Sequence, residues 1–405
     1  MTITRPGLPP LALALALPLA PACAGDDGKE SAGSSASVGS GISGITSITG
    51  GSQGSGGSSS GDDSSSGSGG SGSSGSGSSD SQASSESNGD GGGVKFDIGE
   101  PHDLGMVDDP CNDTGPDCKC TTPEHMPCDN GTGDPFKAIG LNCPGEPQVT
   151  ASPMGSPPAI GVRSSFGGTN TFNPREGAIY AVIGSGLVLD LDKETPFGDS
   201  NAGPTHCNDA LGISLGKTLP APIKPNGVGG DCIQNPGLIG TGDCSNTIAG
   251  QFNQGGSAND YNEMRFVAQV PSDVTSFSYE FAFFSTEWPF YFGSGFNDMY
   301  VGWLNSEKWT GNISFDMQGN PISLNAGFLD FQDGNGTLPV FAGTCMRQHA
   351  GTNWLKTTAG VAPGETITVI FAVFDLSDQI LDSYAFIDNF QWGCEPGGPP
   401  QTIPG

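Results

Sequence analysis

The stretch that decides the fold runs from Val274 to Leu304 and reads VTSFSYEFAFFSTEWPFYFGSGFNDMYVGWL. It is the densest apolar and aromatic run in the chain. Aromatic side chains occupy every second position of its first half, at Phe277, Tyr279, Phe281 and Phe283. A period of two is that of a β-strand with one buried face. The run breaks at Pro289 and the glycines of 293–295, and a second strand is expected over 299–304.

A second segment, 361–392, contains two more expected strands, Thr366–Asp375 and Ser383–Trp392, around an acidic turn. Further upstream, Ile179–Ile183 and Leu187–Leu191 flank a Gly-Ser-Gly turn, which is typical of a β-hairpin. No stretch of helical length shows a period of 3.6 residues. Many short strands separated by Gly and Pro turns predict an all-β fold, an antiparallel, jelly-roll-like β-sandwich over 151–396.

The charge of the chain excludes some partners. Its 405 residues include 14 Lys and Arg against 43 Asp and Glu, a net charge of −29. Nucleic acid is excluded as a partner, because phosphates are bound by Lys and Arg. Docking on an anionic membrane surface is disfavoured for the same reason. Two interpretations are open: the acidity keeps a surface protein soluble, or it collects divalent cations.

The first 22 residues have the organisation of a secretion signal. Arg5 supplies the positive start, and Leu11–Leu19 forms an apolar core too short for a retained membrane helix. Small residues then lead to Cys23, in a pattern that resembles a bacterial lipobox. This predicts lipidation of Cys23 and a lipid-anchored protein on the outer membrane or cell surface. Plain cleavage after an A-x-A site is the alternative.

Residues 23–93 comprise the lipid-anchor Cys and a linker that is nearly all Gly and Ser. Such a composition cannot bury apolar surface, which predicts a disordered tether with a reach of about 45 Å. A cysteine-dense, loop-rich segment is expected over 94–150, and a short tail over 397–405.

The cysteines predict that this segment is fastened to the sandwich. Cys23 aside, the other cysteines form two sets of five: Cys111, Cys118, Cys120, Cys128 and Cys143, then Cys207, Cys232, Cys244, Cys345 and Cys394. An exported protein rarely keeps a free thiol. Because five cannot pair among themselves, full pairing requires at least one bridge between the sets. Cys394, just beyond the last expected strand, is a candidate for it.

Four pieces of the C-terminal part carry a family resemblance: Phe281–Pro289, Phe296–Asp298, Pro363–Thr366 and Asp382–Phe390. In order and spacing the chain resembles the choice-of-anchor L family of bacterial surface proteins over roughly its last third to half. The resemblance implies an exported domain held by one of several kinds of anchor. It implies no shared enzymatic activity and no catalytic residues.

The best candidate site is a set of acidic residues around the two key segments: Glu287, Asp298, Asp375, Asp378, Asp382 and Asp388. Asp388 shares its strand parity with aromatic residues, where a carboxylate must be hydrogen-bonded, paired or metal-bound. Calcium takes several carboxylate and carbonyl oxygens, so these residues are candidate calcium ligands. The alternative is that they cap turns by accepting backbone N–H groups.

Aromatic residues beside these acids are candidate ligand contacts: Trp288, Tyr291 and Phe292. Exposed aromatic rings stack on sugars or anchor a protein partner. The alternative is that they pack under the loop as core.

No catalytic constellation is found. Residues 212–216 match G-x-S-x-G, but the prolines that follow forbid the helix that a nucleophile elbow needs. The sequence therefore predicts a cell-surface lipoprotein that displays a β-sandwich binding or adhesion module on a flexible tether, with a glycan or surface protein as ligand and calcium as a structural ion. A polysaccharide hydrolase that uses paired carboxylates and a purely structural envelope protein are the alternatives.

Overall fold

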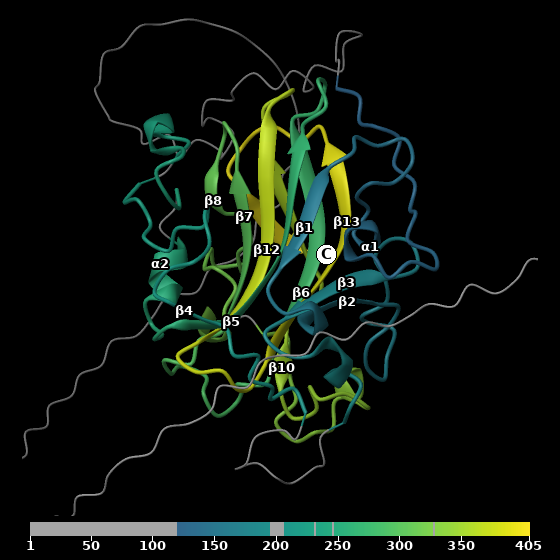
Figure 1. The fold of residues 1–405 in the computed structure, drawn as a ribbon, viewed down its shortest axis with the longest axis vertical. Coiled ribbons are helices and arrows are strands. Elements are labelled where there is room, and N and C mark those ends of the chain that lie inside the picture. Colours follow the sequence, from purple (N-terminus) through teal and green to yellow (C-terminus); the bar gives the residue numbers. More distant parts are fainter. Residues whose placement is uncertain (1–119, 195–205, 231, 245–246, 327–328) are drawn as a thin grey trace, which may run out of the picture. The chain divides into compact units, whose positions relative to one another are not determined.

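The computed structural model describes residues 120–194, 206–230, 232–244, 247–326 and 329–405. The expected signal peptide, Cys23 and the Gly/Ser-rich tether lie outside these residues. The described chain forms two antiparallel β-sheets with a few short helices (Figure 1), which confirms the predicted all-β sandwich. No helix among the described residues is long and apolar enough to cross a membrane.

One sheet has six strands in the order β1-β5-β12-β7-β8, with β4 paired to β5. Its strands are β1 (Thr150–Met154), β4 (Ser214–Gly216), β5 (Ala258–Gln269), β7 (Met299–Asn305), β8 (Thr310–Asn312) and β12 (Thr366–Leu376). The long central strands β5 and β12 pair over almost their whole length, from Thr366 opposite Gln269 to Leu376 opposite Ala258.

The other sheet has eight strands in the order β14-β11-β6-β13-β3-β2, with β10 paired to β6 and to β9. Its strands are β2 (Ile160–Arg163), β3 (Tyr180–Gly184), β6 (Ser276–Ser285), β9 (Phe331–Gln332), β10 (Ala350–Gly351), β11 (Leu355–Gly360), β13 (Ser383–Gly393) and β14 (Gln401–Pro404). Short helices occur only in the connections: α1 (Pro135–Ala138), α2 (Thr247–Phe252), η1 (Pro157–Ala159), η2 (Val188–Asp190), η3 (Pro236–Leu238), η4 (Leu324–Ala326) and η5 (Pro339–Phe341).

The core between the sheets is built from the alternating residues that the sequence singles out. The inward side chains of β6, from Phe277 to Phe283, meet those of β12 and β5, such as Phe371 and Phe266. Tyr279 and Phe371 approach to 4.7 Å between ring centroids. Each such ring removes on the order of 150–250 Å² of surface from water, so this interface is the main source of the sandwich's stability.

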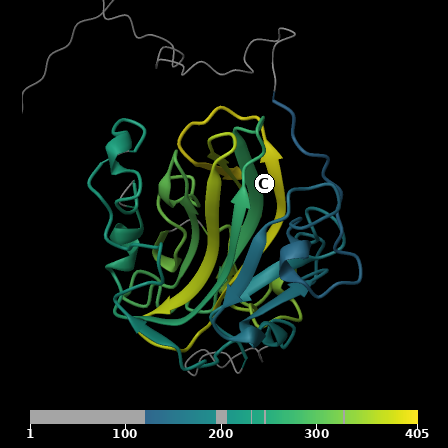
Figure 2. The same cartoon turned by 45° about the horizontal axis from the view of Figure 1, so that its top comes forward.

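Both outer faces are buried as well. The intervening residues of β6 and β13, such as Phe284 and Phe386, pack under loops that contribute Phe166, Phe341 and Trp354. On the outside of the six-stranded sheet, the residues of β7 and β12 are covered by the segment that carries α2. Figure 2 shows this teal segment along one side of the sheets and the blue N-terminal segment along the other. Burial on both faces explains why β12 is apolar almost throughout.

Two local expectations are wrong. The expected hairpin does not form: β3 pairs with β13 and β2, while Val188–Asp190 is a 3₁₀ turn. Asp388 is also expected to share one strand face with the aromatic residues that follow it. This expectation is wrong, because the register shifts between Asp388 and Gln391 and Asn389 has a positive φ of 56°. This β-bulge turns Phe390 into the inter-sheet core.

The segment expected as a tail, 397–405, contributes a strand. Its residues Gln401–Pro404 form β14, which pairs with β11 at the edge of the eight-stranded sheet.

The cysteine-dense segment is fastened to the sandwich, as cysteine parity predicts. A disulfide joins Cys120 to Cys394, with a Cα–Cα distance of 5.8 Å. The other described bridges are Cys128–Cys143, Cys207–Cys345 and Cys232–Cys244. Cys111 and Cys118 lie outside the described residues. Phe136 and Ile139 insert into the inter-sheet core, so this segment and the sandwich form one composite unit.

We expect the Cys120–Cys394 bridge to stabilise the fold more than a bridge over a short loop. It spans 274 residues, whereas Cys232–Cys244 spans 12. In the chain-entropy account, replacing both cysteines of the long-loop pair by Ala costs about 3 kcal/mol more than the same change at the short-loop pair. Denaturant unfolding of the two double variants measures this difference. An equal cost for the two would contradict the account.

Candidate functional site

The candidate site lies at one end of the sandwich, where β6 and β12 end and β7 and β13 begin. It is the end at which β4 and β10 are labelled in Figure 1. The loop 286–298 and the turn 377–382 meet there. Thr286 N donates to Asp382 O at 3.1 Å, and Ser377 Oγ donates to Gly295 O at 2.6 Å. Five of the six predicted acidic residues lie in this region, each near enough to another for their charges to interact: Glu287, Asp298, Asp375, Asp378 and Asp382.

Most buried aspartates in this protein fasten loops. Asp333, for example, accepts hydrogen bonds from the backbone N–H groups of Thr337, Leu338 and Gln348. Asp129, Asp260 and Asp316 do the same elsewhere. A buried carboxylate with two or three such partners is satisfied and needs no ion.

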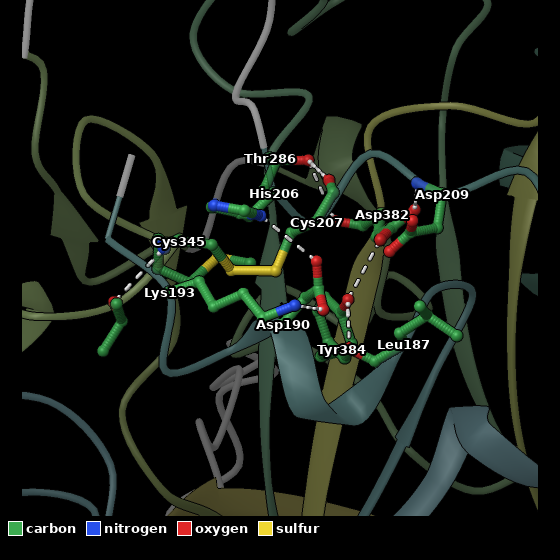
Figure 3. The surroundings of a disulfide bond; sticks show 12 residues. Leu187, Asp190, Lys193, His206, Cys207, Asp209, Thr286, Cys345, Asp382 and Tyr384 are labelled. Atoms are coloured by element: carbon green, nitrogen blue, oxygen red, sulfur yellow. Dashed lines mark hydrogen bonds and ion pairs between the residues drawn. A yellow bond between two sulfur atoms is a disulfide. The ribbon is translucent and has the colours of Figure 1, made fainter. Parts of the chain in front are cut away.

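Asp382 belongs to this fastening class. Figure 3 shows it between Asp209 and Tyr384, beside the Cys207–Cys345 disulfide. Its Oδ1 accepts from Asp209 N at 3.0 Å, and its Oδ2 lies 3.0 Å from the Tyr384 hydroxyl. Burial raises the pKa of Asp382 to about 8, although these hydrogen bonds oppose the shift. Asp382 therefore acts as a hydrogen-bond acceptor that holds a turn, which is the alternative to a calcium ligand.

Asp388 lies elsewhere and is also satisfied. It sits in β13 before the bulge, where its Oδ2 accepts from Arg175 N at 2.6 Å and its Oδ1 from Asn389 N at 2.7 Å. Burial raises the pKa of Asp388 to about 7. The structure does not bring it together with the other predicted acids.

Glu287 and Asp375 differ from all of these. Glu287 is 1% exposed and Asp375 is 0% exposed, yet none of their four carboxylate oxygens has a hydrogen-bond partner within 3.5 Å. The polar side chains that act on Asp375 from nearby are those of Ser185 and Asp298. Glu287 follows the last residues of β6, and Asp375 lies near the end of β12. A buried carboxylate without a partner costs several kcal/mol, so something must neutralise it.

Asp298 lies between these two residues. Its Oδ2 accepts from Ser383 Oγ at 2.7 Å and its Oδ1 from Leu376 N at 3.2 Å. Each oxygen still has a free lone pair. Asp378 is only partly buried, and its Oδ1 has no partner. It places the cluster next to solvent.

Every charged group that acts on this cluster is itself acidic. Burial raises the pKa of Glu287 to about 10, and the charges of Asp298 and Asp378 add to the shift. Burial raises the pKa of Asp298 to about 7 and that of Asp375 well above its usual range. In the absence of a cation, protons must neutralise these groups. No three His, Cys, Asp or Glu side chains in the described ranges converge as a metal-ligand set.

An exposed aromatic loop begins directly after Glu287. Phe290 is 57% exposed, Tyr291 37% and Phe292 47%. Tyr291 and Phe292 are predicted ligand contacts, and both side chains are exposed, although the Tyr291 ring also lies 5.1 Å from that of Phe296 between centroids. The core-packing alternative holds in part for Trp288, which packs against Leu324, Leu329 and Ala350. Sequence reasoning missed Phe290, although it belongs to the same run and follows the Pro289 that turns the chain outward.

Polar residues that sequence reasoning did not select hold this loop. Asn325 donates from Nδ2 to Ser294 O at 2.8 Å and accepts from Gly293 N at 2.6 Å. His349 Nδ1 lies 2.8 Å from Trp288 O. Tyr291 N donates to Glu287 O at 3.0 Å. The backbone frame of the aromatic loop is thus tied to the residue that carries the unpartnered carboxylate.

The comparisons with known proteins add no assignment: the chain matches no protein-family model, no curated protein and no solved structure.

In buffer with a chelator, we expect the stability of the fold to fall as pH rises. Carboxyl groups with raised pKa values bind more protons in the folded state than in the unfolded state, so stability decreases above the unfolded pKa. The decrease begins above the ordinary value of 4.5 for Glu287 and continues through its folded pKa of about 10. Denaturant unfolding at pH 5, 7 and 8 measures it.

The variant Glu287→Gln isolates this contribution. Hydrogen bonds to Glu146 and Glu176 raise the pKa of His125 to about 10, which also weakens the fold as pH rises above 6.5. Because both proteins contain His125, their difference reports the cluster. We expect the decrease between pH 5 and 8 to be at least about 1 kcal/mol smaller in Glu287→Gln. The exposed Glu395→Gln should behave like the parent, and parallel pH profiles for all three would refute the account.

Proposed function

We propose that this chain is an exported surface protein whose β-sandwich binds a glycan through the aromatic loop Phe290–Phe292. The observation that carries the proposal is the exposure of three consecutive aromatic side chains on a loop whose backbone is held by hydrogen bonds. Large exposed aromatic groups are costly in water, and flat rings suit the apolar faces of sugars. A fixed backbone reduces the entropy lost on binding.

The cellular context supports a surface role. All eight described cysteines pair in four disulfides, a pattern typical of oxidising, extracytoplasmic compartments. The expected signal, the lipidation site at Cys23 and the Gly/Ser tether would present the sandwich away from the membrane. The resemblance to the choice-of-anchor L family points to the same setting.

The cluster of Glu287, Asp298 and Asp375 is poorly suited to polysaccharide hydrolysis. A glycosidase needs two carboxyl groups that contact the scissile bond. Glu287, Asp298 and Asp375 are all buried, so a polysaccharide on the surface does not contact them. Binding is therefore the function that this geometry supports best.

We expect the double variant Phe290→Ala, Phe292→Ala to weaken glycan binding at least about tenfold, a loss of about 1.4 kcal/mol, because two contact rings are removed. Binding is measured on a glycan array and then by calorimetry with the selected oligosaccharide. Leu189→Ala is the matched control, since Leu189 is 77% exposed on η2.

The melting temperatures of both variants should stay close to that of the parent, because the altered side chains are exposed. Unchanged glycan affinity in the double variant would contradict the proposal, as would an array without any bound glycan. Capture of a surface protein through the same loop would replace the glycan as ligand.

We expect Cys23→Ser to release the protein from the membrane fraction, because the lipid is the proposed anchor. Fractionation followed by mass spectrometry of the mature N-terminus measures this. An unmodified N-terminus in the parent protein would show that the anchor is not a lipid on Cys23.

A further inference from the structure

Three residues of the cluster carry five buried carboxylate oxygens that have no hydrogen-bond partner within 3.5 Å: both of Glu287, both of Asp375 and Oδ1 of Asp378. The two other predicted acids, Asp382 beside the cluster and Asp388 away from it, are satisfied by N–H and O–H groups. Elsewhere among the described residues, buried carboxylate oxygens without a partner occur singly, at Glu176 Oε2 and Asp209 Oδ2, so a carboxylate with both oxygens unpartnered is the feature that distinguishes this cluster. An unsatisfied buried polar group calls for a specific explanation, and a bound ion is one of the few available.

We propose that one calcium ion binds among Glu287, Asp298 and Asp375, with Asp378 on its solvent side. Calcium is a hard cation that takes six to eight oxygen ligands in a flexible arrangement. The groups whose charges act on Glu287 and Asp375 are all acidic, so the cluster attracts a cation. Magnesium suits the cluster less well, because it demands near-ideal octahedral geometry and gives up its water reluctantly.

The proposed ligands come from one strand and from the turns that follow two strands. Asp375 is held in β12, whereas Glu287 and Asp378 lie in turns that follow β6 and β12. The described side chains do not form a converged metal-ligand set. Calcium binding in the proposed site would therefore draw Glu287 and Asp378 toward Asp375. Asp298, fixed by Ser383 and Leu376, contributes its free lone pairs.

Occupation of the site would also hold the aromatic loop. The carbonyl of Glu287 accepts from Tyr291 N at 3.0 Å, so fixing Glu287 restrains the start of that loop. The calcium site itself does not depend on the nature of the surface ligand. Its test therefore uses no glycan, and its failure is distinguishable from failure of the proposed function.

The experiment is thermal unfolding and calorimetric titration of the full chain, freed of metal with a chelator and then supplied with calcium chloride alone. Calcium binds the folded state only, so at 100 times the dissociation constant it lowers the unfolding equilibrium constant about 100-fold. The melting temperature should rise accordingly. Magnesium chloride at the same concentration should give a much smaller rise.

Glu287→Gln and Asp375→Asn should each weaken calcium binding at least tenfold and remove most of the rise in melting temperature. Asp388→Asn is the matched control: it alters a buried aspartate with a raised pKa that lies outside the cluster, and its calcium response should equal that of the parent. Should Asp375→Asn fail to fold, Glu287→Gln decides alone. Identical melting in calcium and in chelator, or equal loss of the response in Asp388→Asn, would overturn the proposal.

Discussion

The fold depends on the burial of both faces of its central strands. β6, β12 and β13 place aromatic side chains inward against the opposite sheet and outward under long loops, so neither face is left for water. Loops that cover a sheet carry backbone N–H groups out of solvent, and each buried group needs a partner. The covering loops must therefore be fastened, which the chain achieves with disulfides and with the carboxylates of buried aspartates.

Because most buried aspartates accept backbone hydrogen bonds, the buried acidic residues without such bonds at one end of the sandwich stand out. The net charge of −29 is not spread uniformly over a solvated surface, because many carboxylates are internal hydrogen-bond acceptors. Against that background, Glu287 and Asp375 are exceptions, since both are buried and neither carboxylate has a hydrogen-bond partner within 3.5 Å. The same turn that buries Glu287 sends Phe290 outward. A buried carboxylate without a partner and an exposed aromatic side chain thus lie within four residues of each other in the chain.

Much of the fold could be predicted from local pattern. The alternation in 277–283 identifies the inner face of β6, and cysteine parity requires the kind of bridge that Cys120–Cys394 forms. The predictions that were wrong concern residues whose conformation depends on partners distant in the sequence. Asp388 is satisfied by Arg175, 213 positions away, and Val188 turns into a 3₁₀ segment because β3 finds β13 instead. The sequence marked the acids of the site, but only the fold separates the fastened carboxylates from the unpartnered ones. The bulge at Asn389, which reverses side-chain parity, also depends on the fold, because Asn tolerates a positive φ but does not require one.

The central claim is that the unpartnered carboxylates at the loop end are neutralised by a cation rather than by protons. Anomalous diffraction from crystals of the protein grown in calcium, at neutral pH, tests it most directly. The account predicts an anomalous peak between Glu287 and Asp375, with carboxylate oxygens at about 2.3–2.6 Å from it. Carboxyl groups hydrogen-bonded to one another, with no peak between them, would contradict it.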